Sequence, residues 1–299
     1  MRVRFLFLVL LAAGCGSDGG GTDAPATSNT GIPSWIPENS QGEPWLGNLV
    51  ISTSENGLDF ENETLLLEHA GVPSLVRSES GKLIATYQYF SYEDEAMFDV
   101  IAFSISENDG DSWTGPFPVV FDKVPPTEGE SRLVDPALVE LEDGSLRLYF
   151  TIHPDGMENA HPASALAGSI DGVFEYEGPC IEYAGVNLLD PTVIFFEGTW
   201  HYFTPKPGAY GLVNLHGTST DGRTFQWESE IAIEMNMLGN PVLMDGGIRF
   251  YGTGPGGALS AFSHDGFNWT LDEGARSEGF DPAAAQRADG STILITTQN

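Results

Sequence analysis

Two short turn patterns recur five times along this chain, and their order constrains the fold more than any other feature. The first is a proline, an apolar strand, a glycine turn and a second strand, and it starts at Pro73, Pro136, Pro191, Pro241 and Pro282. The second is a serine, a turn containing Gly, and an aromatic residue, and it starts at Ser54, Ser106, Ser169, Ser219 and Ser263. Both patterns predict β-hairpins, because glycine accepts the positive φ of a tight turn.

The copies lie about 40 to 63 residues apart, which is the length of one four-stranded propeller blade. The first copy of the second hairpin, ending at Phe60, has no first hairpin before it, and the copy starting at Pro282 has no second hairpin after it. We therefore expect the two chain ends to share a blade, which leaves no exposed sheet edge. The sequence predicts an all-β, five-bladed β-propeller with blades at 73–113, 136–174, 191–225, 241–269, and 282–297 with 46–60.

Strand parity predicts where a site would lie. If every blade starts at the same end of the ring, all the short glycine turns lie at the opposite end and the long connections lie at the starting end. Asp135, Asp190 and Asp281, each directly before a proline, should then meet at one axial mouth, with Asn240 and Val72 completing the ring. Loops around such a mouth are where propellers bind ligands.

Three explanations fit these aspartates from sequence alone. Carboxylates that converge suit glycoside hydrolysis, which needs an acid and a base or nucleophile. They also suit a cation such as Ca²⁺, which prefers oxygen ligands. The plainest alternative is that Asp-Pro merely starts a strand, with the Asp side chain bonded to local amides. Further candidates for substrate binding near the mouth are Arg132, which could pair with Asp135, and Asn240, Tyr89, His153 and Trp200.

The N-terminal segment has the pattern of a targeting sequence. Two arginines precede the apolar run 5–13, and Gly14-Cys15 follows. Residues 11–15 resemble a bacterial lipobox, which implies a signal peptide over 1–14, a lipidated Cys15, a flexible tether over 15–32 and the propeller over 33–299. We expect a cell-envelope location, in the outer membrane or at the cell surface, with the membrane contacted only through the lipid. Cys180 is then left without a disulfide partner.

The charge balance limits the partners. The 299-residue chain carries 43 Asp and Glu against 12 Lys and Arg, a formal charge of −31. Such a surface repels nucleic acid phosphates and anionic lipids. We expect a monomer that needs no cofactor, with Ca²⁺ at the central channel as an alternative and carbohydrate as the candidate ligand.

Two resemblances add a function to this fold. The segment from Ser106 to Trp113 resembles the Asp-box of sialidases, with Asn108 in the Asp position. The shorter copies, the Asp-Pro starts and the count of five are similar to the propellers of glycoside hydrolase families 43, 32 and 68. The resemblance implies a propeller that hydrolyses or recognises glycans. The alternative is a non-catalytic propeller that binds another ligand or a protein.

The family 43 resemblance also implies roles. That family places a base Asp, a charge-tuning Asp and an acid Glu at successive blade starts, and Asp135 and Asp190 match the first two. The third position holds Asn240 rather than Glu. The resemblance therefore leaves Glu234 as the candidate acid, with Asp190 or Asp281 as the residue that tunes the charge.

Overall fold

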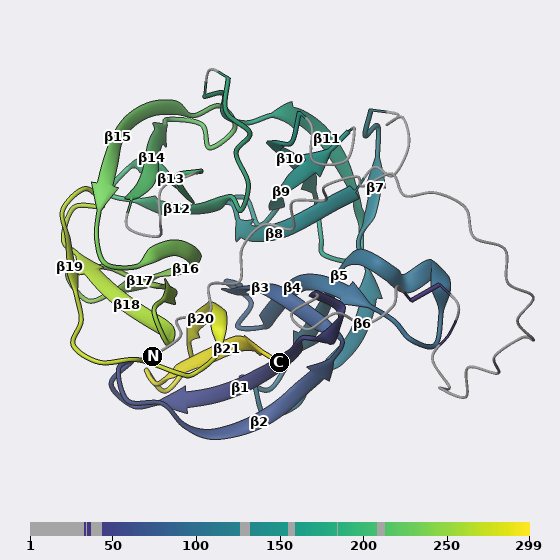
Figure 1. Cartoon of the computed structure of the whole chain (residues 1–299), viewed down its shortest axis with the longest axis horizontal. Coiled ribbons are helices and arrows are strands. Elements are labelled where there is room, and N and C mark those ends of the chain that lie inside the picture. The colour runs from purple at the N-terminus through teal and green to yellow at the C-terminus, as the bar shows by residue number, and fades with distance from the viewer. Residues whose placement is uncertain are drawn as a thin grey trace, which may run out of the picture.

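Five antiparallel sheets stand around a central axis in this computed structural model, which describes residues 33, 35–36, 44–125, 132–154, 159–183, 185–207 and 213–299 (Figure 1). The predicted five-bladed β-propeller is thus confirmed. The predicted signal peptide and Cys15 lie outside the described residues.

The first two blades in chain order lie side by side and are linked by an extra strand. Blade 1 consists of β3 (Ala70–Arg77), β4 (Leu83–Phe90), β5 (Phe98–Ser106) and β6 (Thr114–Pro118). Blade 2 consists of β8 (Arg132–Glu140), β9 (Leu146–His153), β10 (His161–Ala167) and β11 (Val173–Pro179). The short strand β7 (Val120–Asp122) follows blade 1 in the chain and pairs in parallel with β11, so blade 2 has five strands.

Blades 3 and 4 have four strands each. Blade 3 consists of β12 (Thr192–Phe196), β13 (Thr199–Pro205), β14 (Val213–Ser219) and β15 (Gln226–Ala232). Blade 4 consists of β16 (Asn236–Met244), β17 (Gly247–Gly254), β18 (Gly257–Ser263) and β19 (Trp269–Leu271).

Blade 5 joins the two ends of the described chain, as the half-repeats predict. Its order is β2 (Glu61–Glu68), β1 (Asn48–Ser54), β21 (Thr292–Gln298) and β20 (Phe280–Gln286) (Figure 1). Strands β1 and β21 pair without a register shift from Asn48↔Gln298 to Ser54↔Thr292. The ring therefore closes by hydrogen bonds between segments that are far apart in sequence.

The second hairpin of a blade is held by its own serine together with an aspartate, or with an asparagine in blades 1 and 5. In blade 3, Ser219 Oγ donates to Asp221 Oδ1 at 2.8 Å and accepts from the Gly222 N–H at 3.0 Å. Asp221 Oδ1 also accepts from the N–H of Arg223 at 2.8 Å. Ser263 and Asp265 repeat this arrangement in blade 4. Side-chain bonds to the turn's own amides therefore fix these hairpins locally.

The aromatic residue that ends this hairpin packs against the preceding blade. The rings of Phe225 and Tyr149 lie 6.0 Å apart, and those of Trp269 and Phe203 lie 5.5 Å apart, both in edge-to-face contact. The core is accordingly divided into clusters between neighbouring sheets. Each repeat thus supplies both a turn and the ring that joins two blades.

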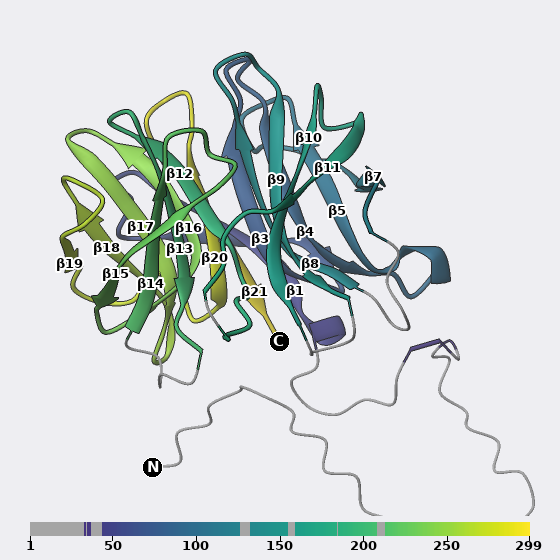
Figure 2. The same ribbon diagram turned by 90° about the horizontal axis from the view of Figure 1, so that it is seen from above.

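The two ends of the ring differ in their connections. The edge-on view places the 3-10 helix η1 (Pro44–Leu46) and the C-terminus at one end (Figure 2). A second 3-10 helix, η2 (Glu95–Met97), lies in the connection between β4 and β5. The glycine turns within the hairpins lie at the opposite end, because the strands of each blade are antiparallel. Among the described residues, no helix is long and apolar enough to span a membrane.

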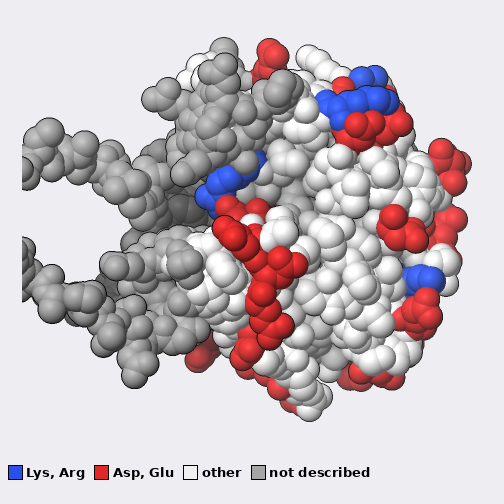
Figure 3. Space-filling view, turned by 90° about the vertical axis from the view of Figure 1, so that its right-hand side faces the viewer, with Lys and Arg blue, Asp and Glu red and all other residues white. Residues whose placement is uncertain are grey.

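Acidic side chains are more frequent than basic ones on the face of the molecule drawn in Figure 3. On the side drawn in Figure 3, red groups are widespread and the few blue groups lie against red ones. Ion pairs between the blade strands account for several of the basic residues, for example Arg147 with Glu177 at 2.8 Å. The excess of negative charge is therefore a property of the exposed surface.

Candidate functional site

The three aspartates sit at an unusual point of the inner strand. Asp135, Asp190 and Asp281 have φ of 56°, 52° and 48°, a region that side chains other than Gly rarely adopt. Each is followed by proline, and β-bulges interrupt the pairing at Asp135 and Asp281. A bulge re-aims the side chain at the position where it occurs. Here the bulges re-aim Asp135 and Asp281, whereas Asp190 lies just before β12 begins at Thr192.

Val72 shows that this backbone shape does not require a carboxylate. It occupies the same position in blade 1, also precedes a proline, and has φ of 50°. Because valine adopts this backbone conformation too, the conformation does not explain why three other blades carry Asp. The explanation that Asp-Pro only initiates a strand therefore accounts for the backbone but not for the three carboxylates.

The structure brings the three carboxylates together. The carboxyl groups of Asp135 and Asp190 interact directly, and Asp281 interacts electrostatically with both. Two carboxylates this close oppose each other's ionisation, which favours one proton between them. Asp281 lies beside this pair as a third carboxyl group.

All three pKa values are raised, and burial is the main cause. Burial raises the pKa of Asp190 well above its usual range, and the charges of Asp135 and Asp281 raise it further. Burial and Asp135 together raise the pKa of Asp281 to about 7. Burial also raises the pKa of Asp135, but the Thr151 hydroxyl and His153 oppose it. Asp135 is thus the group best supported in its charged form, although all three keep some accessible surface.

Threonines from the preceding blades hold this cluster. Thr151 of β9 is buried and bonds the Asp135 carboxylate, and its Oγ1 accepts from the Asp190 N–H at 3.1 Å. Thr253 of β17 repeats the contact, with its Oγ1 accepting from the Asp281 N–H at 2.8 Å. Sequence reasoning missed both threonines. Each lies near the end of the second strand of its blade, and this repeated position could have identified them from the sequence.

Arg132 has a different partner from the one expected. Its guanidinium forms an ion pair with Asp99, and its Nη2 donates to Asp99 Oδ1 at 2.8 Å. Gln88 also donates to Asp99. Asp99 lies in β5 of the neighbouring blade, and no sequence pattern marked it. The suggested pairing of Arg132 with Asp135 was wrong, because Asp99 reaches the guanidinium from blade 1.

Two residues expected near the mouth lie there but have structural contacts. His153 is buried at the end of β9, opposite Arg132 in the register, and lies near Asp135. Tyr89 is half-buried opposite Ala70 and packs on the core between blades 5 and 1. Of these two residues, both predicted to bind substrate, His153 lies beside the aspartate cluster and Tyr89 packs in the core.

Asn240 uses both polar ends of its side chain inside the protein. Its Oδ1 accepts from the Leu75 N–H at 2.9 Å, and its Nδ2 donates to the Pro241 carbonyl at 2.9 Å. Leu75 lies in β3, so Asn240 connects the inner strands of blades 4 and 1. The structure thus gives Asn240 a role in holding the ring around the axis.

Trp200 lies at the opposite end from the aspartates, so its placement at the mouth was wrong. It follows the glycine turn between β12 and β13 and contacts the turn at Gly222, where an added Cβ would lie 2.8 Å from its ring. Its ring also packs against Phe195, with centroids 5.0 Å apart. Trp200 is close to Asp190 in sequence, but strand β12 lies between them and carries the chain to the other end of the ring.

Glu234 does not take part in the cluster. Its side chain is exposed in the connection between β15 and β16, and the interactions of the three aspartates do not include it. Cys180 is buried, and burial raises the pKa of its thiol to about 12, so it is unreactive. Within the described ranges, no group of three or more His, Cys, Asp or Glu side chains is placed to hold a metal ion.

A hollow lies close to Asp190 along the chain. Its volume is ≈ 560 Å³, and it lies between segments 159–162, 179–183 and 185–188, with His161, Tyr183 and Leu188 among its lining residues. Leu188 is two residues before Asp190, but the three aspartates do not line this hollow. One lining residue of the hollow is thus close to Asp190 in the chain, but the hollow and the carboxylate cluster share no residue.

Comparison with known proteins supports the fold. No family model matches the sequence, and no curated protein matches it. Among solved structures, the chain is similar to Zg3597, a family 117 glycoside hydrolase of Zobellia galactanivorans (13% identity, TM-score 0.53, 87% of each chain covered). It is also similar to the GH43_1 enzyme from Xanthomonas citri complexed with xylotriose (14% identity, TM-score 0.56, 76% of this chain and 87% of that one). A third is a protein of unknown function from Dyadobacter fermentans (14% identity, TM-score 0.55, 87% and 86%). At these identities the likeness concerns the glycosidase-like propeller fold alone.

Proposed function

We propose that this propeller hydrolyses glycans at its axial mouth, where Asp135, Asp190 and Asp281 meet. The observation that carries the proposal is the convergence of three carboxylates from three blades, at a backbone position that Val72 can also occupy. The fold that the chain shares with glycoside hydrolases agrees with this proposal, including one solved with xylotriose.

Roles follow from the environment of each carboxylate. Asp135 has support for its charge from Thr151 and His153, which suits a base. Asp281 has a pKa raised to about 7, which suits an acid that is partly protonated at neutral pH. Asp190 shares its proton with Asp135 and so sets the charge of the pair. In this proposal Asp281 takes the acid role that the family resemblance had left to Glu234.

A non-catalytic glycan-binding propeller is the second candidate. Two-carboxylate hydrolysis needs the groups about 5 to 9.5 Å apart. Asp135 and Asp190 instead touch each other, so that pair acts as one proton-sharing unit. A mouth of this kind could hold sugar hydroxyls without cleaving a bond.

Hydrolysis of a panel of aryl-glycosides and neutral polysaccharides tests the two candidates. We expect activity that falls by about 10³-fold or more in Asp135→Asn, with Asp245→Asn at an exposed turn as the matched control. Glycan binding without turnover, reduced by Asp135→Asn, supports the binding propeller. If neither turnover nor binding is found with a folded protein, the proposal is overturned.

We also propose that the protein is a monomer anchored in the cell envelope through a lipid on Cys15. The support is the basic and apolar pattern ahead of Gly14-Cys15. Metabolic labelling with an alkyne fatty acid tests the anchor. Label in the wild type and none in Cys15→Ser is the expected result, and equal labelling of both proteins contradicts it.

A further inference from the structure

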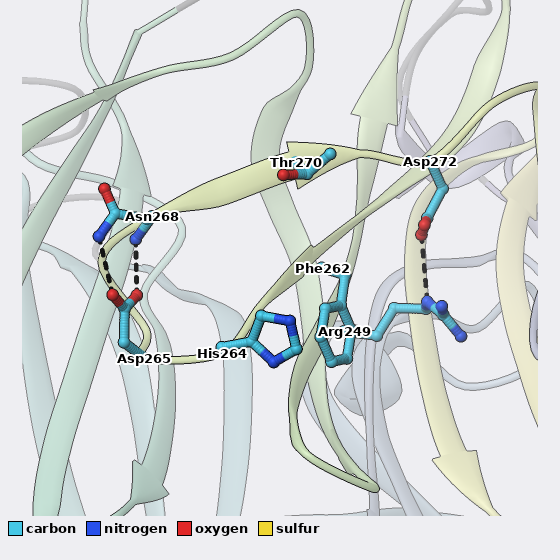
Figure 4. Close-up of a pocket in the computed structure, with 7 residues that line it drawn as sticks. All are labelled: Arg249, Phe262, His264, Asp265, Asn268, Thr270 and Asp272. Carbon is cyan, nitrogen blue, oxygen red and sulfur yellow. Dashed lines mark hydrogen bonds and ion pairs between the residues drawn. The ribbon is translucent and has the colours of Figure 1, made fainter.

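A second hollow lies on blade 4, away from the aspartates. Its volume is ≈ 520 Å³, within the size range of small-ligand sites, and its lining residues are Arg249, Phe262, His264, Asp265, Asn268, Thr270 and Asp272 (Figure 4). His264 and Asp265 belong to the second hairpin turn of this blade, which lies at the end opposite the axial mouth. None of these seven residues contacts the carboxylate cluster in the structure.

The strand register builds this hollow. Arg249 of β17 lies opposite Phe262 of β18, and Phe262 lies opposite Thr270 of β19. Paired residues share one face of a sheet, so the three side chains form a row across the blade. The other face of the same strands carries Phe250 and Ala261, which pack in the core with blade 3. The row therefore faces the other way, on the side where Tyr251 bonds the Gly57 carbonyl of blade 5.

Each charged group in the hollow already has partners within blade 4. Arg249 Nε donates to Asp272 Oδ2 at 3.1 Å, and the Ser260 hydroxyl donates to the same oxygen at 2.7 Å. The Asp265 carboxylate accepts from the N–H groups of Phe267 and Asn268 and from the Asn268 side chain. These donors hold the pKa of Asp265 well below its usual range. The charges of Arg249 and Asp272 are thus paired, whereas Asp265 keeps a negative charge that neutral donors stabilise.

Polar groups and an aromatic ring line the open space. Thr270 is exposed and presents its hydroxyl, and Figure 4 shows the Arg249–Asp272 pair and the Asp265–Asn268 pair flanking the hollow on two sides. The Phe262 ring lies between them, with the Arg249 guanidinium 5.7 Å from its centroid and His264 in edge-to-face contact. An apolar ring between two planar polar pairs matches a ligand with hydroxyls around an apolar face.

We propose that this hollow binds one neutral sugar unit of a glycan, independently of the axial mouth. A neutral polyol gains hydrogen bonds from both flanking pairs without breaking either. An anion would meet two carboxylates and a chain of formal charge −31. A cation would compete with Arg249 for Asp272, and at Asp265 with the neutral donors that already bond this carboxylate. Neutral sugars are therefore the ligand class that leaves the existing ion pair and hydrogen bonds intact.

Affinity electrophoresis in gels containing a soluble neutral polysaccharide (arabinoxylan, arabinan, galactan or β-glucan) tests this proposal on the mature chain. We expect at least one of the four to retard the wild type, and Phe262→Ala and Thr270→Val each to weaken the retardation by about fivefold or more. Polygalacturonate, which is acidic, should give no retardation. The melting temperature of each variant shows whether it is folded, and Thr270→Val changes only an exposed side chain.

Matched variants separate this site from other causes. Phe117→Ala removes an exposed aromatic residue from the outer strand of blade 1 and should leave the retardation unchanged. The fold reduction caused by Phe262→Ala should be the same in an Asp135→Asn background, whatever Asp135→Asn itself does to retardation or hydrolysis. The proposal is overturned if no neutral polysaccharide retards the protein, if polygalacturonate retards it as strongly, if folded Phe262→Ala and Thr270→Val both match the wild type, or if the Phe262→Ala reduction disappears in the Asp135→Asn background.

Discussion

The backbone N–H of Asp190 donates to the hydroxyl of Thr151 at 3.1 Å, and this bond joins the start of blade 3 to the second strand of blade 2. Equivalent bonds run from Asp281 to Thr253 at 2.8 Å and from Val72 to Thr297 at 3.2 Å. At Asp190 the same threonine also bonds the Asp135 carboxylate. A contact that assembles neighbouring blades thus also positions two of the three aspartates.

Thr151→Val should therefore affect both stability and the site. Val has nearly the same shape but no hydroxyl, so the Asp190 N–H loses a buried partner, and we expect a loss of about 1 to 3 kcal/mol in the free energy of unfolding. Urea denaturation measures it. Thr64→Val on the exposed outer strand β2 is the control and should change stability by less than about 0.5 kcal/mol. Equal effects of the two variants would contradict a role for the Thr151 hydroxyl.

Asp281→Asn should stabilise the protein at alkaline pH. The folded pKa of Asp281 is raised to about 7, whereas the unfolded chain has about 3.9, so the folded state binds more protons between these values and wild-type stability falls as pH rises through them. Asn stays neutral and escapes this loss. Because the side chain keeps some access to water, we expect a gain of about 1 to 3 kcal/mol at pH 8 and almost none at pH 4. Denaturation at both pH values measures the gain, and a gain of equal size at pH 4 would contradict the buried-carboxylate explanation.

Gly222→Ala should be much more costly than Gly144→Ala. Both glycines have positive φ, +66° and +80°, so both substitutions strain the backbone by about 1 to 2 kcal/mol. An added Cβ at Gly222 also lies 2.8 Å from the Trp200 ring, whereas nothing lies within 4 Å at Gly144. We expect a total loss of about 2 to 4 kcal/mol at Gly222, because overpacking adds to the strain. Thermal or urea unfolding of the pair measures the difference, and equal losses would show that the contact between turn and ring is unimportant.

His216 should make the fold sensitive to acid. It is fully buried in blade 3, where His201 Nδ1 and His216 Nε2 lie 3.0 Å apart. Burial and the neighbouring His201 lower the pKa of His216 to about 3. The unfolded state then binds more protons between this value and about 6.5, so stability falls as pH drops through that range.

His216→Leu should flatten this dependence, because Leu has no proton to gain. We expect the loss of stability between pH 6.5 and pH 4.5 to shrink by about 1 to 3 kcal/mol relative to the wild type. His264→Leu, at an exposed turn, is the control and should leave the dependence unchanged. Urea denaturation across this pH range decides between them, and a wild-type slope retained in His216→Leu would contradict the assignment.

The fold was predictable because its signals are local. Each Ser-Asp-Gly turn bonds its own amides, as at Ser219 and Asp221, so five hairpins can be recognised without tertiary contacts. The half-repeats at Phe60 and Pro282 then leave few alternatives to a closed ring. Parity of the strands also places Asp135, Asp190 and Asp281 at one mouth, since each starts the inner strand of its blade.

Only the tertiary structure decided which groups touch. Four features join separate strands or blades: the interaction of Asp135 with Asp190, the pairing of Arg132 with Asp99, the bond from Leu75 to Asn240 and the row of side chains on blade 4. Turn chemistry depends on residues a few positions apart and is written in the sequence. Hydrogen bonds and charge interactions depend on distances of a few ångströms between distant segments, and these arise only when the blades pack around the axis.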